Sequence, residues 1–293
     1  MTRSGRRPAD DADVSERGER TMAKIAIFCR KTGATAVHTA EHFRVRGLDV
    51  SVFVVEAGVR KKRSSTERQF QAAHEQFRRY LVRRSSLKER VRLAATGVFH
   101  RLPSACRDLA RPNVLRRAKA MGIPAVVVQK HSTPETMHIL ERHDISYVLL
   151  ASSAWLVKEP LLSMPTTRII NAHCAKLPEH RSLDALPWSV VEGDPVGLTA
   201  HFVDQGIDTG PVLLFEEVVP QPGDNLIRLR RRIDAKKPEV FLKAVRGLID
   251  GTLSPVSQRP SDGVHHRPMT FDELVEAERA LQRRLGRRPD CVP

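Results

Sequence analysis

The chain has 293 residues, of which 41% are hydrophobic, and a formal net charge of +15 at pH 7. This composition predicts an ordinary soluble globular protein with one large core or two modest ones. A membrane span and a secretory signal are excluded, because no run of about 18 apolar residues occurs and residues 1–22 contain no apolar stretch, so we expect a cytoplasmic location.

The first twenty residues are charged and almost devoid of apolar side chains, and we expect residues 1–22 to be a disordered tail. Met22 directly precedes the first strand-like run, which makes a start at Met22 instead of Met1 a hypothesis for intact-mass measurement. The four cysteines form no C-x-x-C pair. We therefore expect neither a disulfide framework nor a metal site.

Apolar runs and helical patterns alternate through the first half of the chain. The predicted helices cover 36–47 and 132–143. The predicted strands cover 24–28, 50–57, 123–129 and 146–152, and a further strand begins at Ile169. This alternation predicts an α/β fold with a Rossmann-like, mostly parallel twisted sheet and helices on both faces.

Between the second and third predicted strands lies a basic insertion, residues 60–119. It holds eighteen Lys and Arg against four acidic residues, which is nearly the whole charge excess of the chain. We expect one or two basic helices there, with a charged face that is merely solvated or that binds an acidic partner. Such a partner would be tRNA or another nucleic acid, a phosphorylated substrate, or an anionic membrane surface.

The second half of the chain predicts a hairpin and then helices. The runs 196–204 and 211–219 are joined by a short glycine-rich connection, which favours an antiparallel hairpin at the sheet edge. The helical tail includes a capping box at Thr270 and Glu273. We assign residues 23–220 to one α/β domain and residues 221–293 to C-terminal helices that pack on it.

Polar residues follow the apolar start of the strand at Ile169. Asn171 and His173 are two residues apart, so in an extended chain they point to the same face, at the carboxyl end where open α/β sheets build sites. Asp208 lies in a glycine-flanked loop, and His201 lies within a predicted strand. Taken singly, a histidine here is more often structural and a loop aspartate more often a turn former.

Taken together, these side chains suit acyl chemistry. When an amine attacks a formyl carbon, a tetrahedral oxyanion forms and the nitrogen must lose a proton. Asn171 could donate to the oxyanion, His173 could act as acid and base, and Asp208 could orient the ring or a relaying water. A rival interpretation makes Cys174 a nucleophile beside His173, but adjacent residues on a strand face opposite ways.

The stretch 171–213 resembles the core signature of the 10-formyltetrahydrofolate-dependent formyltransferases (phosphoribosylglycinamide, methionyl-tRNA and sugar N-formyltransferase types). Weaker resemblance covers roughly residues 23 to 270. The matching positions are Asn171, His173, Leu177, Pro178, Arg181, Pro187, Gly197, Thr199, His201, Asp208, Thr209 and Gly210.

The resemblance implies a role for each part of the site. The catalytic residues would be Asn171, His173 and Asp208, in a catalytic domain spanning residues 23–220. His201, Thr209 and Gly210 would support them. The co-substrate would be 10-formyltetrahydrofolate, without a metal, held around Leu150, Ala151, Ser152 and Gly206.

The acceptor end of the site departs from the family pattern. Family members that act on phosphoribosylglycinamide carry a Ser-Gly-rich turn after the first strand, which cradles a phosphate. The equivalent turn here has a single glycine, and Cys174 and Lys176 stand where the family usually has uncharged residues. The residues expected to bind the acceptor are Arg30, Lys31, Thr32, Gly33 and Arg181.

We therefore expect an enzyme that moves a formyl group to a primary amine of a small anionic acceptor, of the amino-sugar nucleotide or phosphoribosylglycinamide type. Alternatives are formylation of methionyl-tRNA, hydrolysis of formyltetrahydrofolate, and a nucleic-acid-binding protein on a retained scaffold. Formylation of tRNA ranks lower because such enzymes carry a further C-terminal β-barrel, whereas only 73 residues follow Pro220 here. The oligomeric state is left open.

Overall fold

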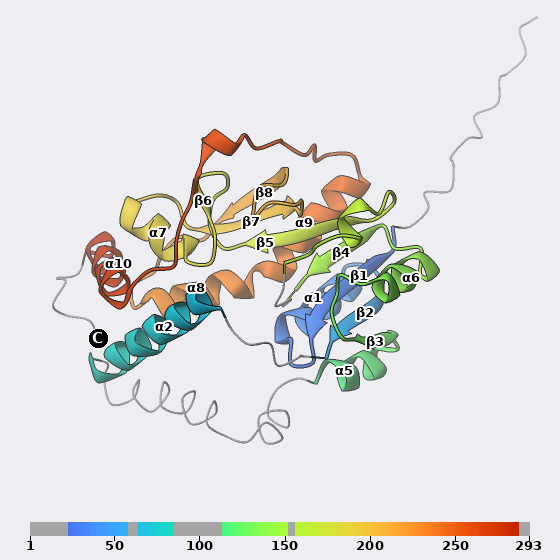
Figure 1. The fold of residues 1–293 in the computed structure, drawn as a ribbon, viewed down its shortest axis with the longest axis horizontal. Helices are drawn as coiled ribbons and strands as arrows, with labels where there is room; N and C mark the ends of the chain where they lie inside the picture. Colours follow the sequence, from blue (N-terminus) through green and yellow to red (C-terminus); the bar gives the residue numbers. More distant parts are fainter. Residues whose placement is uncertain (1–22, 58–63, 85–112, 152–155, 287–293) are drawn as a thin grey trace, which may run out of the picture.

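The computed structural model describes residues 23–57, 64–84, 113–151 and 156–286. Its centre is a seven-stranded sheet in the order β3-β2-β1-β4-β5-β7-β8 (Figure 1). The first five strands in this order are parallel, and β7 and β8 add antiparallel at one edge. The strands are β1 (Ile25–Arg30), β2 (Val50–Glu56), β3 (Ala125–Val128), β4 (Tyr147–Leu150), β5 (Arg168–His173), β7 (Gly197–Phe202) and β8 (Val212–Glu217). The predicted parallel sheet and edge hairpin are confirmed.

Helices cover both faces of this sheet. Side chains of β1 alternate between two buried clusters: Ile25 and Ile27 face the layer of α1 and α9, whereas Ala26 and Phe28 face the side of α6. The helices are α1 (Ala34–Val45), α2 (Ser65–Arg84), α5 (Val114–Met121), α6 (Pro134–Arg142), α7 (Ala185–Glu192), α8 (Leu226–Ala235), α9 (Lys237–Ile249) and α10 (Phe271–Arg284), with short 3-10 turns at Leu161–Ser163 and Pro260–Asp262. The predicted two-sided helical cover is confirmed.

Local signals set several element ends. The Asn225 side chain accepts from the Arg228 amide and begins α8. The capping box of Thr270 and Glu273 begins α10, as predicted. The first strand runs two residues further than its apolar run indicated. Cys29 and Arg30 stay in the sheet because they pair with β2 residues. Tertiary pairing therefore outweighs the polar sequence at this strand end.

The described part of the basic insertion is helical. Helix α2 packs on α10, with Phe77 and Leu81 buried and the Tyr80 ring edge-on to Phe271 at 6.0 Å. Its remaining face is largely exposed and rich in arginine. Residues 58–63 and 85–112 of this region lie outside the described residues, as does the predicted tail 1–22.

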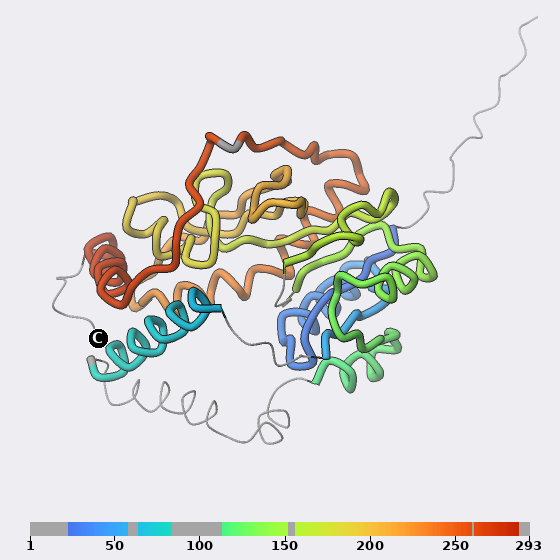
Figure 2. The backbone as a smooth tube through the Cα atoms, in the orientation of Figure 1, coloured from blue at the N-terminus to red at the C-terminus, as the bar shows by residue number. Residues whose placement is uncertain are grey.

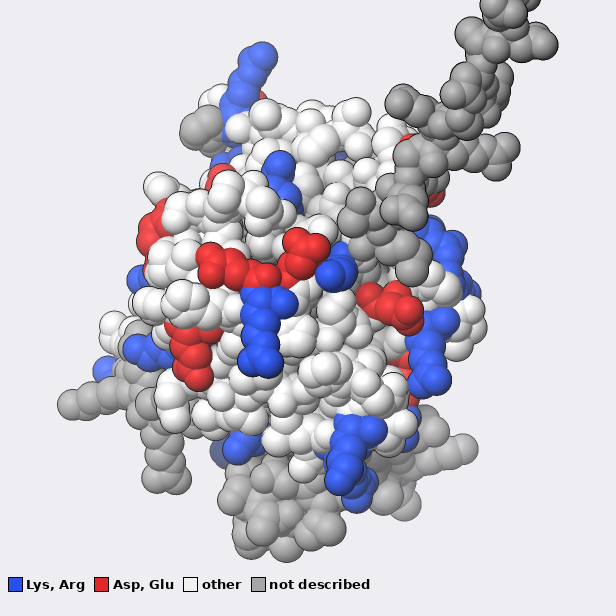
Figure 3. Space-filling model, turned by 90° about the vertical axis from the view of Figure 1, so that its right-hand side faces the viewer, with Lys and Arg blue, Asp and Glu red and all other residues white. Residues whose placement is uncertain are grey.

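On the face of the molecule shown in Figure 3, basic side chains are interspersed with acidic ones. An acidic partner is therefore better sought at the exposed face of α2 than on this surface. Among the described helices, none has the length and apolar character that crossing a bilayer requires.

A two-stranded sheet of β6 (His180–Arg181) and β9 (Val264–His265) was not predicted. It attaches a segment that we call the C-terminal strap, residues 252–270, which runs over the β7 and β8 side of the molecule between α9 and α10 (Figure 2). Gly263 permits this approach, because a Cβ atom there would lie 1.6 Å from the Pro178 carbonyl oxygen.

Candidate active site

Strand pairing brings the predicted polar residues together. Asn171 on β5 lies directly opposite His201 on β7, and His173 lies opposite Thr199. Asp208 reaches the same place from the loop between β7 and β8, where its backbone has the left-handed φ of 56°. The four side chains Asn171, His173, His201 and Asp208 therefore form one cluster next to the carboxyl end of β5.

Two glycines shape the loop that carries Asp208. A Cβ atom on Gly206 would lie 2.0 Å from Thr209 Oγ1, and one on Gly210 would lie 2.0 Å from the Phe202 carbonyl oxygen. Asp204 closes the turn, because its Oδ1 accepts from Thr209 Oγ1 at 2.6 Å and from the Gly206 amide at 3.1 Å. The local role of these residues is therefore to fold the loop tightly.

His173 has a polar partner at each ring nitrogen. Nε2 lies 2.9 Å from the His180 carbonyl oxygen, and Nδ1 lies 3.3 Å from Asp208 Oδ2. Because a carbonyl only accepts, Nε2 carries the proton of the neutral ring. Burial lowers the pKa of His173 to about 4, although the Asp208 carboxylate opposes this shift. At neutral pH the ring is neutral, with the Nδ1 lone pair facing the carboxylate.

Asp208 is a largely buried, ionised carboxylate. Burial alone would raise its pKa, but His173, His201 and the Ser182 amide outweigh burial and hold the pKa of Asp208 below its usual range. The Ser182 amide donates to Oδ2 at 3.1 Å. The carboxylate is thus placed to stabilise a positive charge on His173.

Asn171 and His201 complete the network. His201 Nδ1 donates to the Phe202 carbonyl at 2.8 Å, so its Nε2 accepts from Asn171 Nδ2 at 3.1 Å. The Asn171 amide also donates to Asp208 Oδ1 at 3.5 Å, the limit of a hydrogen bond. The Asn171 amide, which is expected to donate to the oxyanion, is therefore already oriented. Its long contact with Asp208 is the one that a bound substrate oxygen can replace.

One residue that supports the aspartate loop was not predicted from the sequence. Gln258, on the C-terminal strap, donates through Nε2 to the carbonyl oxygens of Asp208 at 3.2 Å and Gly210 at 2.6 Å. Sequence position gave no signal for it, because it lies 50 residues beyond Asp208. The strap therefore fixes the backbone of the aspartate loop.

The remaining predicted residues lie at different places around the cluster. Leu150 ends β4, beside β5, and the Ala151 amide donates to the Phe28 carbonyl at 3.1 Å; Ser152 lies outside the described residues. Their role toward folate stays a prediction. The rival role of Cys174 finds no support, because both nitrogens of His173 are used by Asp208 and the His180 carbonyl.

Residues expected at the acceptor end are divided by the fold. Arg30 and Lys31 are exposed at the carboxyl end of β1, and the Gly33 amide closes the turn onto the Arg30 carbonyl at 3.0 Å, with Thr32 inside that turn. Arg181 is instead 4% exposed and donates to the strap, at 3.1 Å to Gln258 Oε1 and 3.2 Å to the Arg259 carbonyl oxygen.

One further polar residue at this sheet edge was missed. Glu56 ends β2 beside Arg30 and is 1% exposed, and neither carboxylate oxygen has a hydrogen-bond partner among the described residues. Burial raises its pKa, while Arg30 and Lys130 act in the opposite direction. A buried acceptor group of this kind suits a ligand that donates hydrogen bonds.

Comparisons with known proteins find relatives of this chain. Residues 104–245 match the sequence model of a family described as Formyl transferase. A methionyl-tRNA formyltransferase of Desulfotalea psychrophila is 27% identical over 153 residues, which are 52% of this chain and 47% of that protein. The chain spans about half the length of the curated relatives it matches.

Two solved structures show the same fold. Glycinamide ribonucleotide transformylase 1 from Symbiobacterium toebii aligns with a TM-score of 0.53 and 22% identity, over 83% of this chain and 93% of that one. A sugar N-formyltransferase from Shewanella sp FDAARGOS_354 aligns with a TM-score of 0.50 and 14% identity, over 84% and 76% of the two chains. At such identities the likeness concerns the fold.

Proposed function

We propose that this chain, whose residues 104–245 match the formyl transferase family model, moves the formyl group of 10-formyltetrahydrofolate to the primary amine of a small anionic acceptor. The observation that carries this proposal is the hydrogen-bonded cluster of Asn171, His173 and Asp208. It places an oriented amide donor at 3.5 Å and a neutral imidazole at 3.3 Å from the two oxygens of one ionised carboxylate.

Each group has a defined task in the transfer. The acceptor nitrogen attacks the formyl carbon, and the carbonyl oxygen becomes an oxyanion that takes the place of Asp208 Oδ1 at the long Asn171 contact. The nitrogen loses its proton to His173 Nδ1, which acts as the general base. Asp208, 3.3 Å from that atom, stabilises the imidazolium that results.

Collapse of the tetrahedral intermediate completes the reaction. The bond between the formyl carbon and N10 of the folate breaks, and N10 takes up the proton from His173 Nδ1. The products are the formamide of the acceptor and tetrahydrofolate, so atoms and charge balance without an oxidant. His173 returns to its neutral form with Nε2 still donating to the His180 carbonyl.

An anionic acceptor is supported by the residues at the carboxyl edge of the sheet. Arg30 and Lys31 present two exposed cations at the end of β1, and the buried carboxylate of Glu56 lies beside them. Cations suit a phosphate, and the carboxylate suits the hydroxyl or ammonium groups of a sugar amine. Acceptors of the amino-sugar nucleotide and phosphoribosylglycinamide types contain both kinds of group.

Methionyl-tRNA formylation is the second candidate. It is supported by the curated relatives, which are methionyl-tRNA formyltransferases, and by the arginine-rich, exposed face of α2. A binding titration of tRNA at two salt concentrations tests it, because phosphate contacts release counterions and weaken steeply with salt. Weak, salt-insensitive binding would leave the α2 face as a solvated surface.

The deciding experiment is release of tetrahydrofolate from 10-formyltetrahydrofolate, followed by absorbance. Reactions contain water alone, amino-sugar nucleotides, phosphoribosylglycinamide or charged tRNA. Release that depends on a small amine supports the proposal and identifies the acceptor class. Release in water alone would replace it with hydrolysis, and tRNA binding without any release would favour a nucleic-acid-binding protein on this scaffold.

A further inference from the structure

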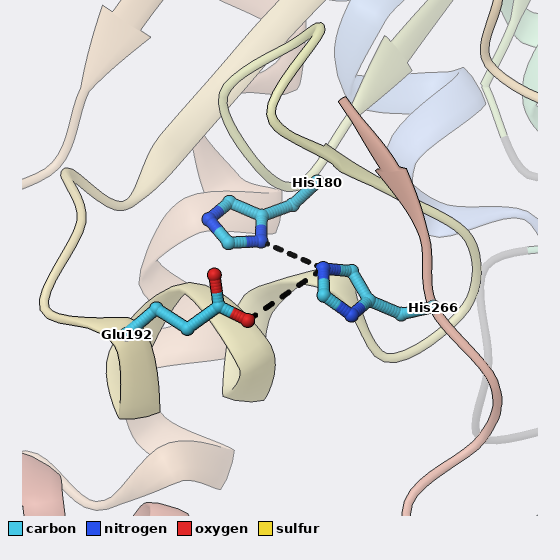
Figure 4. A group of neighbouring side chains, drawn as sticks. All are labelled: His180, Glu192 and His266. Atoms are coloured by element: carbon cyan, nitrogen blue, oxygen red, sulfur yellow. Dashed lines mark hydrogen bonds and ion pairs between the residues drawn. The ribbon is translucent and has the colours of Figure 1, made fainter. Parts of the chain in front are cut away.

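Outside the proposed active site, three metal-ligating side chains converge on one point. His180 Nδ1 lies 3.0 Å from His266 Nε2, and Glu192 Oε1 lies 4.0 Å from the same Nε2 atom. All three ligand atoms lie within 4.8 Å of one another. Figure 4 shows the side chains pointing toward one another from β6, the end of α7 and the C-terminal strap.

The surroundings orient both imidazoles. His180 Nε2 donates to Asp194 Oδ2 at 2.7 Å, which leaves Nδ1 of the neutral ring as a lone pair facing the cluster. A histidine that donates its second nitrogen to a carboxylate is the usual arrangement of a metal ligand. The His266 ring stacks on Trp188 at 4.9 Å, so its plane is fixed as well.

We propose that His180, His266 and Glu192 bind a divalent transition-metal ion, with Zn²⁺ as the best match. Two imidazoles and a carboxylate are a common zinc ligand set, with water in the fourth position. Two nitrogens bound tetrahedrally to zinc lie about 3.3 Å apart, close to the 3.0 Å between His180 Nδ1 and His266 Nε2. Small shifts of the half-exposed Glu192 side chain complete the site.

The site would act as a clamp on the C-terminal strap. His266 belongs to the strap, and its amide donates to the Arg181 carbonyl at 3.2 Å. His180 belongs to the segment whose carbonyl oxygen accepts from His173 Nε2. A bound ion therefore ties the strap to the backbone that orients the His173 ring, so His180, His266 and Glu192 act as positioning residues.

A proton offers the competing explanation of the same geometry. Without metal, His266 Nε2 donates to the His180 Nδ1 lone pair, and the Glu192 carboxylate remains 4.0 Å away as a bystander. If the site binds metal, replacing Glu192 abolishes metal binding and replacing Asp194 weakens it. If a proton bridges the two histidines, neither replacement has such an effect. A metal titration measures both.

The test uses the full chain without a polyhistidine tag, stripped with EDTA and dialysed. Co²⁺ is titrated and the visible absorbance of tetrahedral cobalt is recorded, and Zn²⁺ is then added as a competitor. We expect one Co²⁺ per chain, displacement by Zn²⁺, and a higher thermal midpoint with Zn²⁺. Metal content and absorbance do not depend on transfer activity, so this test is separate from that of the proposed function.

Three variants and a matched control make the assignment specific. H266A and E192Q should lose the cobalt signal and the thermal shift, and D194N should weaken the affinity by roughly 10–100-fold, the usual effect of removing a carboxylate that orients a ligand. H265A, which replaces the exposed histidine next to His266 in the strap, should bind like the parent. Circular dichroism checks that each variant folds.

Two results would overturn the proposal. One is the absence of saturable binding near one ion per chain in the parent protein. The other is parental affinity in a folded E192Q variant together with parental affinity in D194N. Either outcome would leave the proton-bridged pair of His180 and His266 as the explanation of the cluster.

Discussion

Replacing Asp208 by Asn tests the proposed mechanism most directly. The substitution removes one charge and little volume, and asparagine tolerates the left-handed φ of 56° that an alanine would adopt only with strain. At 3.3 Å, a carboxylate and an imidazolium interact by about 5 kcal/mol in an effective dielectric of about 20. Since about 1.4 kcal/mol corresponds to a factor of ten in rate, the ceiling is between three and four orders of magnitude.

We therefore expect Asp208→Asn to lower kcat by roughly 10²–10³-fold, while folate binding stays near the parent value. The assay is acceptor-dependent release of tetrahydrofolate, with folate binding followed by fluorescence. D49N is the matched control, because Asp49 is exposed and lies just before the amino end of β2, whereas the Asp208 cluster lies next to the carboxyl end of β5. A kcat within about threefold of the parent would refute the role given to Asp208.

Three further substitutions and one labelling experiment test the packing of the chain. Gly210→Ala should lower the free energy of urea unfolding by about 1–3 kcal/mol, because its Cβ would meet a backbone oxygen at 2.0 Å. Gln258→Met should lower it by about 2–3 kcal/mol through lost hydrogen bonds to two loop carbonyls, whereas exposed Gln76→Met should leave it unchanged. Thr270→Ala removes a helix cap and should cost about 1 kcal/mol in the same assay. Burial raises the pKa of Cys29 to about 12, so at pH 8 iodoacetamide should label it only after unfolding, as peptide mass analysis would show.

The sheet was predictable because its strands carry local signals. Each parallel strand is a short apolar run, and the edge hairpin has a glycine-rich connection that limits how the chain can turn. Asn171 and His173 were predictable for the same reason, because an i and i+2 pair shares one face of a strand. Their pairing with His201 follows once β7 lies antiparallel to β5.

The C-terminal strap was not predictable from local pattern. Strands β6 and β9 have two residues each, too few for any periodicity to appear. The contacts that hold the strap are between residues far apart in the chain, such as His180 with His266, 86 residues away. The expectation of no metal site rested on cysteine spacing and could not register such a pair. Arg181 shows the same limit, because its partners Gln258 and Arg259 are strap residues.

The sequence pattern also leaves open which nitrogen of His173 is available for chemistry. Spacing identifies Asn171 and His173, and the family resemblance adds Asp208. Three backbone groups set the hydrogen-bonding states of this cluster: the His180 carbonyl at His173, the Ser182 amide at Asp208 and the Phe202 carbonyl at His201. The first of these occupies Nε2 of His173 and leaves Nδ1 as the proton acceptor. Residues 180 and 181 are held in place by β9 of the strap, so the strap determines the direction in which the proposed catalytic base points.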